Sequence, residues 1–190
     1  MPPDATATKR RLLDAAYSQF AQYGLAGARV ERIGEIAQAN KRLIYVHFGN
    51  KADLFDLVVA KSLADLAEAV PFDADDLSRY AGDLFDYLLE HPQVLRLTGW
   101  ARLERPEPTA AEVDAYRPKI DAIVSAQHSN SVTKEIAPTD VLALVIGLTT
   151  AWASASPALQ SLAPEAPWSP ERLRHHRAAM TAAVQAFVAS

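Results

Sequence analysis

The densest group of residues able to do chemistry lies within residues 29–51, near the start of the 190-residue chain. It combines basic side chains with ring donors: Arg29, Lys41, Arg42, Tyr45, His47 and Lys51. Guanidinium, ammonium, phenol and imidazole groups donate to phosphate oxygens, and arginine can also bond guanine through O6 and N7. These residue types therefore point to a nucleic acid as the partner.

The charge distribution agrees with this interpretation, although the net charge of −4 does not. Residues 1–51 contain eight basic and four acidic residues, a net charge of +4. The remaining residues contain eleven basic and nineteen acidic residues, a net charge of −8. A basic head on an acidic body indicates that only the head meets an anionic partner.

Helices must position these residues, because apolar side chains recur at three- and four-residue spacing and nowhere alternate as in a strand. The pattern predicts an all-α fold of about nine helices, over residues 7–23, 30–38, 41–48, 51–70, 75–90, 92–104, 110–129, 139–156 and 170–189. Residues 157–169, rich in Pro, Ser and Ala, are expected to form a loop. Pro118 should kink or split the seventh helix.

The third helix has the properties of a helix that enters the DNA major groove. Ile44 and Phe48, four residues apart, share one side and should anchor the helix inward. Arg42, Leu43 and Val46 then project outward, where arginine can bond guanine and the apolar groups can pack on thymine methyls.

Capping residues mark the ends of the helices in this head. Gly24 is expected to end the first helix. Asn40 is the expected N-cap of the third, because its side chain can accept orphan N–H groups of the first turn, and it is also one of the expected DNA contacts. Asn50 followed by Asp53 resembles a capping box, and the helix N-terminus at Lys51 offers N–H groups to a phosphate.

The ordered segments RLLDAA (11–16), VERI (30–33) and IYVHFGNK (44–51) resemble the N-terminal signature of the TetR family over roughly residues 9–58. The resemblance implies that the helix starting near Asn40 is the recognition helix of a helix-turn-helix. It also implies that Tyr45, His47 and Lys51 contact the DNA backbone. Structural roles remain open for two of them, since Tyr45 can cap the domain and His47 can pack internally.

The sequence departs from the family pattern at three points. Arg29 stands where the second helix usually has a hydroxyl cap, so it is expected to contact phosphate instead. Gln38 replaces the usual glycine of the turn, so either the turn differs slightly or a residue other than glycine holds a left-handed conformation at some energetic cost. Arg42 and Leu43 replace a small Gly-Thr pair, so the base preference of the head cannot be inherited from relatives.

The predicted domains are a helix-turn-helix domain over residues 1–50, a linker helix over 51–70, and a sensing and dimerising domain over 71–190. The resemblance implies a homodimer through the last two helices, which would present two heads to a palindromic operator. Apolar stripes support this pairing: Val141, Leu144, Val145, Leu148 and Trp152 on one helix, and Ala179, Met180, Ala183, Val184 and Phe187 on the other.

The resemblance also implies a cavity for a small-molecule effector in the second domain, and core packing is the competing role for its walls. The candidate ligand contacts are Phe85, Leu89, Trp100, Leu103, Tyr116, Ile120 and Trp152. Their aromatic bias favours an apolar or flat ligand. Binding is expected to move the fourth helix and to release a repressor from its operator.

Other functional classes find little support in the sequence. The chain has no cysteine, and no nucleophile elbow, phosphate loop or metalloprotease motif is present. We expect a cytoplasmic protein that is not an enzyme, needs no cofactor or metal, and does not bind a membrane. A helical small-molecule-binding or scaffold protein that has lost DNA binding remains the alternative.

Overall fold

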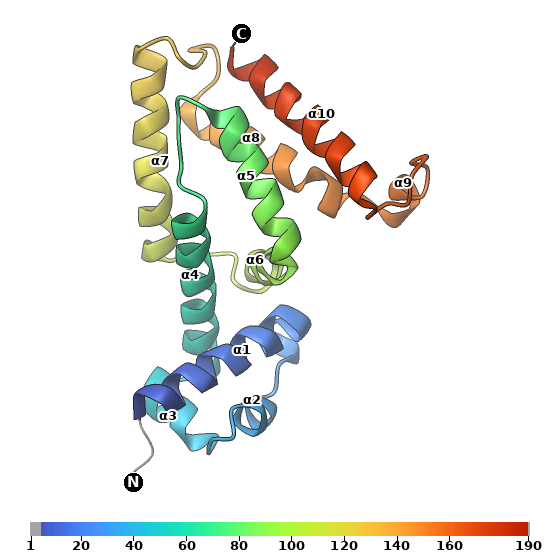
Figure 1. The fold of residues 1–190 in the computed structure, drawn as a ribbon. Coiled ribbons are helices and arrows are strands. Elements are labelled where there is room, and N and C mark those ends of the chain that lie inside the picture. Colours follow the sequence, from blue (N-terminus) through green and yellow to red (C-terminus); the bar gives the residue numbers. More distant parts are fainter. Residues whose placement is uncertain (1–4, 190) are drawn as a thin grey trace. The chain divides into compact units, whose positions relative to one another are not determined.

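The computed structural model describes residues 5–189, in which ten helices and no strand are present (Figure 1). The helices are α1 (Ala5–Gly27), α2 (Val30–Ile36), α3 (Arg42–Phe48), α4 (Lys51–Ala69), α5 (Leu77–Glu90), α6 (Pro92–Glu104), α7 (Ala110–His128), α8 (Pro138–Ser154), α9 (Pro157–Gln160) and α10 (Pro170–Val188). The all-α prediction is confirmed. None of these helices is long and apolar enough to cross a membrane.

Two local predictions about the helices were wrong or incomplete. A short helix, α9, interrupts the expected loop because the Ser156 side chain accepts the N–H of Leu159 at 3.2 Å and Pro157 occupies the first turn. Pro118 lies inside α7 without splitting it.

The chain folds into two compact units. The first contains the residues up to Leu66 together with His91–Glu112, and the second contains Ala67–Glu90 and Val113–Ser190. The first unit therefore includes α6, which the sequence analysis assigned to the sensing domain. The reason lies in packing, since Leu97 of α6 is fully buried and Trp100 and Ala101 pack on the core of the first unit.

The core of the first unit is formed by α1 packed on α2 and α6. The side chains without exposed surface include Leu12, Phe20, Ile33, Ile44, Leu54 and Phe55. The rings of Phe20 and Phe55 meet edge-to-face, with their centroids 5.1 Å apart. Aromatic pairs of this geometry add to the free energy of burial. The core thus holds the short helices α2 and α3 against the long helices α1 and α4.

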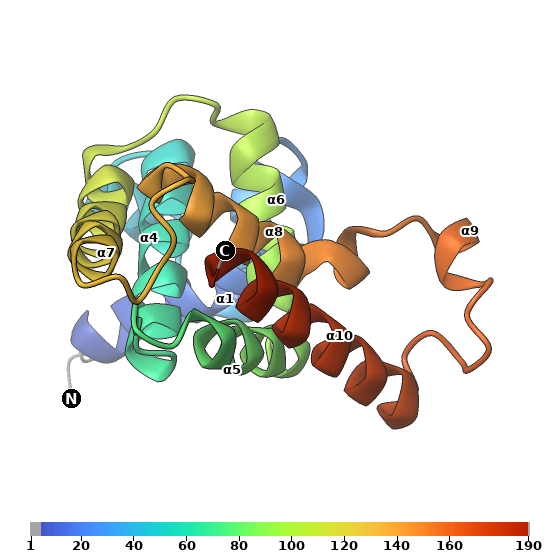
Figure 2. The ribbon, with the colours of Figure 1, turned by 90° about the horizontal axis from the view of Figure 1, so that it is seen from above.

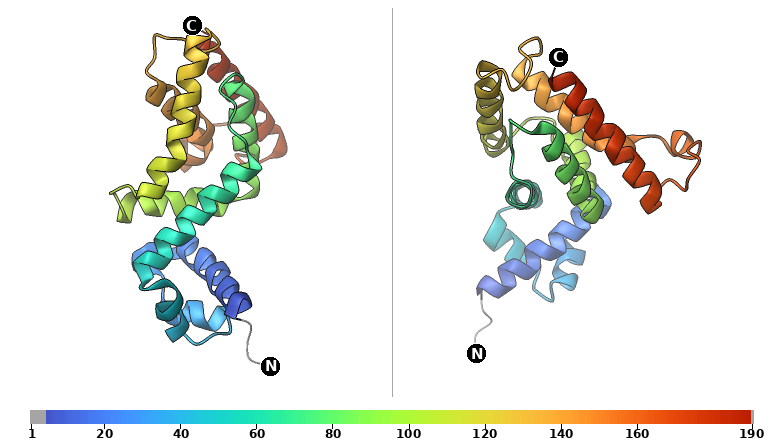
Figure 3. Two further views of the ribbon diagram at one scale, coloured as in Figure 1. Left: turned by 90° about the vertical axis from the view of Figure 1, so that its left-hand side faces the viewer. Right: turned by 45° about the horizontal axis from the view of Figure 1, so that its top comes forward.

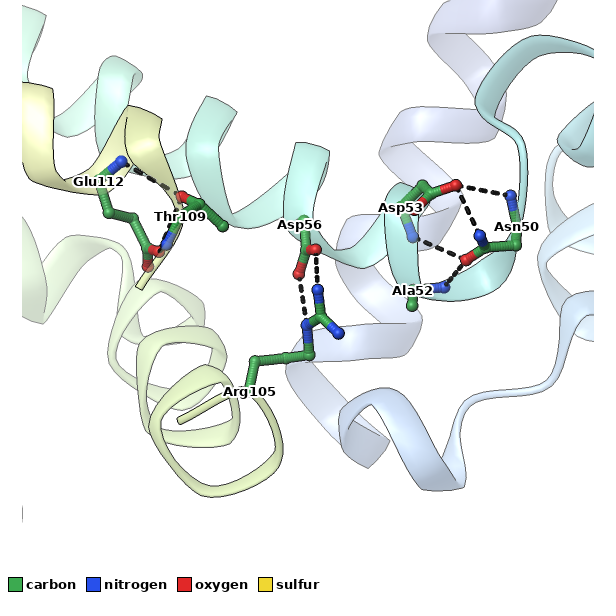
Figure 4. A network of polar contacts seen from close by, with 7 residues as sticks. All are labelled: Asn50, Ala52, Asp53, Asp56, Arg105, Thr109 and Glu112. Carbon is green, nitrogen blue, oxygen red and sulfur yellow. Dashed lines mark hydrogen bonds and ion pairs between the residues drawn. The ribbon is translucent and has the colours of Figure 1, made fainter. Parts of the chain in front are cut away.

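The end of α1 is held by α6. Gly24 has φ of 69°, a left-handed conformation that glycine adopts without strain, and it ends the regular part of α1 as predicted. The Glu104 carboxylate of α6 then accepts the backbone N–H groups of Leu25 and Ala26. Arg105, directly after α6, forms an ion pair with Asp56 of α4 (Figure 4).

In the second unit, α10 packs on both α5 and α8, and α5 also packs on α8 (Figure 2). Views from two further directions show α5 beside α10 along much of its length (Figure 3). The buried residues of these helices include Leu77, Ala81, Val141, Val145 and Val184. Arg177 of α10 reinforces the contact by an ion pair with Asp86 of α5 at 2.9 Å.

Candidate DNA-binding interface

The third helix presents the two faces that the sequence predicted. Ile44 and Phe48 are buried in the first unit. Arg42 and Tyr45 are exposed, Tyr45 at 53%, and Val46 is exposed at 73%. Leu43 differs from the expectation, because it is half-buried against the core. The outward surface of α3 therefore consists mainly of Arg42, Tyr45 and Val46.

The turn between α2 and α3 is tight and contains a non-glycine residue with positive φ. Gln38 has φ of 50°, so the left-handed conformation is the one of the two alternatives that this turn adopts. The turn folds back onto α2, where the N–H of Ala39 bonds the carbonyl oxygen of Gly34 at 2.9 Å. A Cβ atom at Gly34 would lie 3.0 Å from the Ala39 oxygen. A side chain at this position would force the turn to shift by a few tenths of an ångström.

The start of α3 is capped as expected. The Asn40 side chain accepts the N–H of Arg42 at 2.9 Å, which satisfies one donor of the first turn. The side chain of Arg42 itself is exposed. Asn40 is therefore engaged with the backbone, whereas the adjacent arginine presents its donors to solvent.

Lys41 has a partner that the sequence analysis missed. Its Nζ atom lies 2.7 Å from Oε1 of Glu31 on α2. This hydrogen bond lowers the pKa of Glu31 and raises the pKa of Lys41, so both groups stay charged at neutral pH. Because the pair is formed across the turn, its existence depends on the conformation of Gln38 and not on a helical spacing.

The start of α4 forms a complete capping box (Figure 4). The Asn50 side chain accepts the N–H groups of Ala52 and Asp53, at 2.8 and 3.0 Å, and the Asp53 carboxylate accepts the N–H of Asn50 at 3.3 Å. Lys51, the first residue of α4, donates to the carbonyl oxygen of Ala26 at 3.3 Å. Its ammonium group is thus held near the end of α1, and only part of the side chain is exposed.

The remaining predicted contacts lie at the edges of this surface. Arg29 is exposed at the N-cap position of α2, with extended backbone and no side-chain cap, as its replacement of a hydroxyl residue implied. His47 is half-buried, with its ring 6.0 Å from that of Phe48. Lys9 of α1 packs on the same ring, with its Nζ atom 5.7 Å from the Phe48 ring centroid.

The candidate ligand contacts do not all belong to one unit. Trp100 and Leu103 lie in the first unit, where Trp100 packs on the core and Leu103 is 72% exposed. The other five lie in the second unit: Phe85, Leu89, Tyr116, Ile120 and Trp152. Phe85 and Trp152 are buried and both approach the His176 ring, with centroid distances of 5.6 and 5.4 Å.

Two family models match the chain. Residues 12–58 match the family model of bacterial regulatory proteins, tetR family, and thus include every predicted DNA contact. Residues 76–185 match the tetracyclin repressor-like C-terminal domain.

Individual relatives carry related descriptions. The chain is 39% identical over 163 residues to the HTH-type transcriptional repressor SCO4008 of Streptomyces coelicolor, covering 84% of each chain. It is 30% identical over 108 residues to the HTH-type transcriptional repressor NicS of Pseudomonas putida, covering 53% of this chain and 51% of that one. The crystal structure of the putative transcriptional regulator SCO4942 of S. coelicolor superposes with a TM-score of 0.83 at 33% identity, covering 95% of this chain and 98% of that chain.

Proposed function

Because the chain belongs to the TetR family of bacterial regulatory proteins, we propose that it represses transcription as a homodimer on a palindromic operator and is released by a small-molecule effector. The observation that carries this proposal is the exposed face of α3. There, Arg42 and Tyr45 stand free of the core while Ile44 and Phe48 hold the helix in place.

DNA recognition divides between base contacts and backbone contacts. Arg42 is the residue that bonds a guanine edge when α3 enters the major groove, and Val46 supplies an apolar contact. Tyr45, His47 and Lys51 contact phosphates, which fix the position of the helix without selecting a sequence. Lys41 exchanges its bond with Glu31 for a bond with a phosphate.

The surface that pairs two copies is the exposed side of α8 and α10. Half of the apolar stripe residues are buried within the chain itself: Val141, Val145, Trp152, Met180 and Val184. The exposed side carries mostly small residues: Ala143, Leu144, Gly147 and Ala151 on α8, and Ala178, Ala179, Ala182 and Ala183 on α10. Small side chains permit the close helix approach that a four-helix interface between two copies requires. Pairing would hold two α3 helices about one turn of DNA apart, or a small multiple of that spacing.

The effector acts through the helices that run between the units. The unit boundary falls within α4, between α5 and α6, and within α7. In the first unit, α6 holds α1 through Glu104, and Arg105 binds α4 through Asp56. A displacement of α4 or α6 is therefore passed to the head. Effector and DNA then weaken each other's binding by the same free energy.

Selection of DNA from a random pool tests the proposal. The full-length protein is incubated with duplexes carrying a randomised centre, and the bound fraction is amplified and sequenced over several rounds. We expect enrichment of a two-fold symmetric sequence, bound by two chains as measured by sedimentation of the complex. A bound pool no different from the starting pool would refute the proposal and favour a helical binding protein without DNA recognition.

A further inference from the structure

Lys119 lies in the middle of α7, with its ammonium group near aromatic rings of the second unit. Its Nζ atom is 5.7 Å from the centroid of the Tyr116 ring and 6.0 Å from that of the Phe72 ring. Phe72 packs edge-to-face on the buried Tyr80 of α5, with centroids 4.9 Å apart. A cation thus lies over two aromatic rings, one of which packs on a third. Tyr116 was a predicted ligand contact, whereas Lys119 and Phe72 were not.

This lysine has no carboxylate partner among residues 5–189. Asp73, which follows Phe72 directly, is already bonded to Arg79 at 2.9 Å. Burial lowers the pKa of Lys119, because the ammonium group has lost part of its water shell and no negative charge compensates for the loss. An incoming anion would supply that compensation. An ion pair with Lys119 would release more free energy than one with an exposed lysine, because the anion must first displace the water around an exposed ammonium group.

The aromatic surroundings are accessible on the α7 side. Tyr116 is 43% exposed, and Val113, one turn earlier on α7, is exposed as well. A flat ring can stack on the exposed part of Tyr116 while an acidic group reaches the ammonium of Lys119. A cationic compound would instead face an uncompensated positive charge.

We infer that Lys119 anchors the effector, and that the effector is an organic acid: an anionic group that pairs with Lys119, carried on a flat apolar body that contacts Tyr116 and Phe72. This inference rests on the proposed function in taking the effector site to lie in the second unit. The inference narrows the expected class of effector from any apolar or flat compound to an anionic compound of that shape.

Two dyes with the same aromatic body test the inference: anilinonaphthalene sulfonate, which is anionic, and phenylnaphthylamine, which is neutral. Each is titrated by fluorescence into the full-length wild type and into Lys119→Met, which keeps an apolar chain of similar length without the charge. We expect Lys119→Met to weaken binding of the sulfonate dye by about tenfold or more, because a charge-assisted contact is lost. Binding of the neutral dye should change little.

Matched variants separate the charge of Lys119 from its packing. Lys119→Arg should keep most of the affinity for the sulfonate dye, and Lys134→Met, at an exposed lysine of the same unit, should keep all of it. If Lys119→Met does not fold, as judged by far-UV circular dichroism, Lys119→Gln takes its place. Unchanged sulfonate binding in Lys119→Met, or in Lys119→Gln where that variant replaces it, or an equal loss for both dyes, would overturn the inference.

The dye measurement does not depend on DNA, so its failure can be told from failure of the proposed function. Lys119→Met should bind the selected duplex as the wild type does, because Lys119 lies outside the first unit. A wild type that discriminates the dyes through Lys119 but selects no DNA sequence would refute the repressor and leave the anion site standing.

Discussion

Gly34→Ala is the substitution that most directly tests how the α2–α3 turn positions the recognition helix. The new Cβ would lie 3.0 Å from the oxygen of Ala39 and 3.3 Å from the nitrogen of Lys41. Both atoms belong to the backbone, so neither can rotate away, and the start of α3 must shift by a few tenths of an ångström. Overpacking of this kind costs about 1–3 kcal/mol, whereas replacing glycine by alanine inside a helix returns about 1 kcal/mol.

Gly99→Ala provides the matched control. Gly99 lies inside α6 of the same unit, and its Cβ would have no atom within 4 Å. We expect Gly99→Ala to raise the free energy of unfolding by about 1 kcal/mol through helix propensity alone. Gly34→Ala should therefore be less stable than Gly99→Ala by roughly 1–3 kcal/mol, the cost of the overpacking. Urea titrations followed by circular dichroism at one fixed protein concentration measure both values.

DNA affinity gives the second measurement on the same pair. Binding requires α3 in its original position, so a Gly34→Ala chain that has relaxed its strain must regain it on the operator. The affinity should then fall about tenfold for each 1.4 kcal/mol of relaxed strain, and Gly99→Ala should bind as the wild type does. The reasoning is refuted if Gly34→Ala gains as much stability as Gly99→Ala and binds the selected duplex equally well.

Three further predictions concern charges and surfaces. Glu31→Gln should raise DNA affinity by about two- to fivefold in a fluorescence anisotropy titration, because it frees Lys41 from an exposed ion pair. Glu35→Gln, with the same charge change on the same helix, should raise the affinity less. Equal increases would argue against a role for the Lys41–Glu31 pair. Gly147→Gln should shift the protein to monomers in sedimentation velocity while leaving its helical content intact, since a Cβ there meets no atom within 4 Å of its own chain; an unchanged dimer would place the interface elsewhere. Burial, with the Arg172 guanidinium nearby, lowers the pKa of His176 below its ordinary 6.5, so the neutral ring stabilises the fold above pH 6.5 and this stability is lost as the pH falls through the lowered pKa. The melting temperature of His176→Gln should therefore fall less between pH 7 and pH 5 than that of the wild type. Parallel curves of melting temperature against pH would contradict the lowered pKa.

The local features of the head could be predicted because they depend on neighbours in sequence. Gly24 ends a helix, Asn40 and Asn50 cap helices, and Gln38 takes a left-handed conformation. The helix end at Gly24 and the two caps follow from the residue's own conformational preference or from a hydrogen bond to a residue at most three positions away. The conformation of Gln38 was one of two alternatives, raised because the family pattern has glycine at this position. The inward anchoring of α3 by Ile44 follows in the same way from helical spacing.

The features that were missed depend on contacts between residues distant in sequence. The assignment of α6 to the first unit rests on Leu97 packing against helices at the start of the chain. The bond between Glu104 and Ala26 spans seventy-eight residues. Likewise, Lys119 gains its character from Phe72, on a segment forty-seven residues earlier. Periodicity identifies the buried side of a helix but not the helix that covers it.

The central claim is that α3 recognises DNA sequence through Arg42, while Lys51 contacts a phosphate of the DNA backbone. The most direct test measures the affinities of Arg42→Ala and Lys51→Ala for the selected duplex and for a scrambled duplex of the same length, over a range of salt concentrations. We predict that Arg42→Ala loses roughly tenfold or more on the selected duplex and little on the scrambled one, because a base contact carries the discrimination. Lys51→Ala should lose equally on both and show a shallower salt dependence. Equal losses on both duplexes for Arg42→Ala, or no loss on either, would contradict the account.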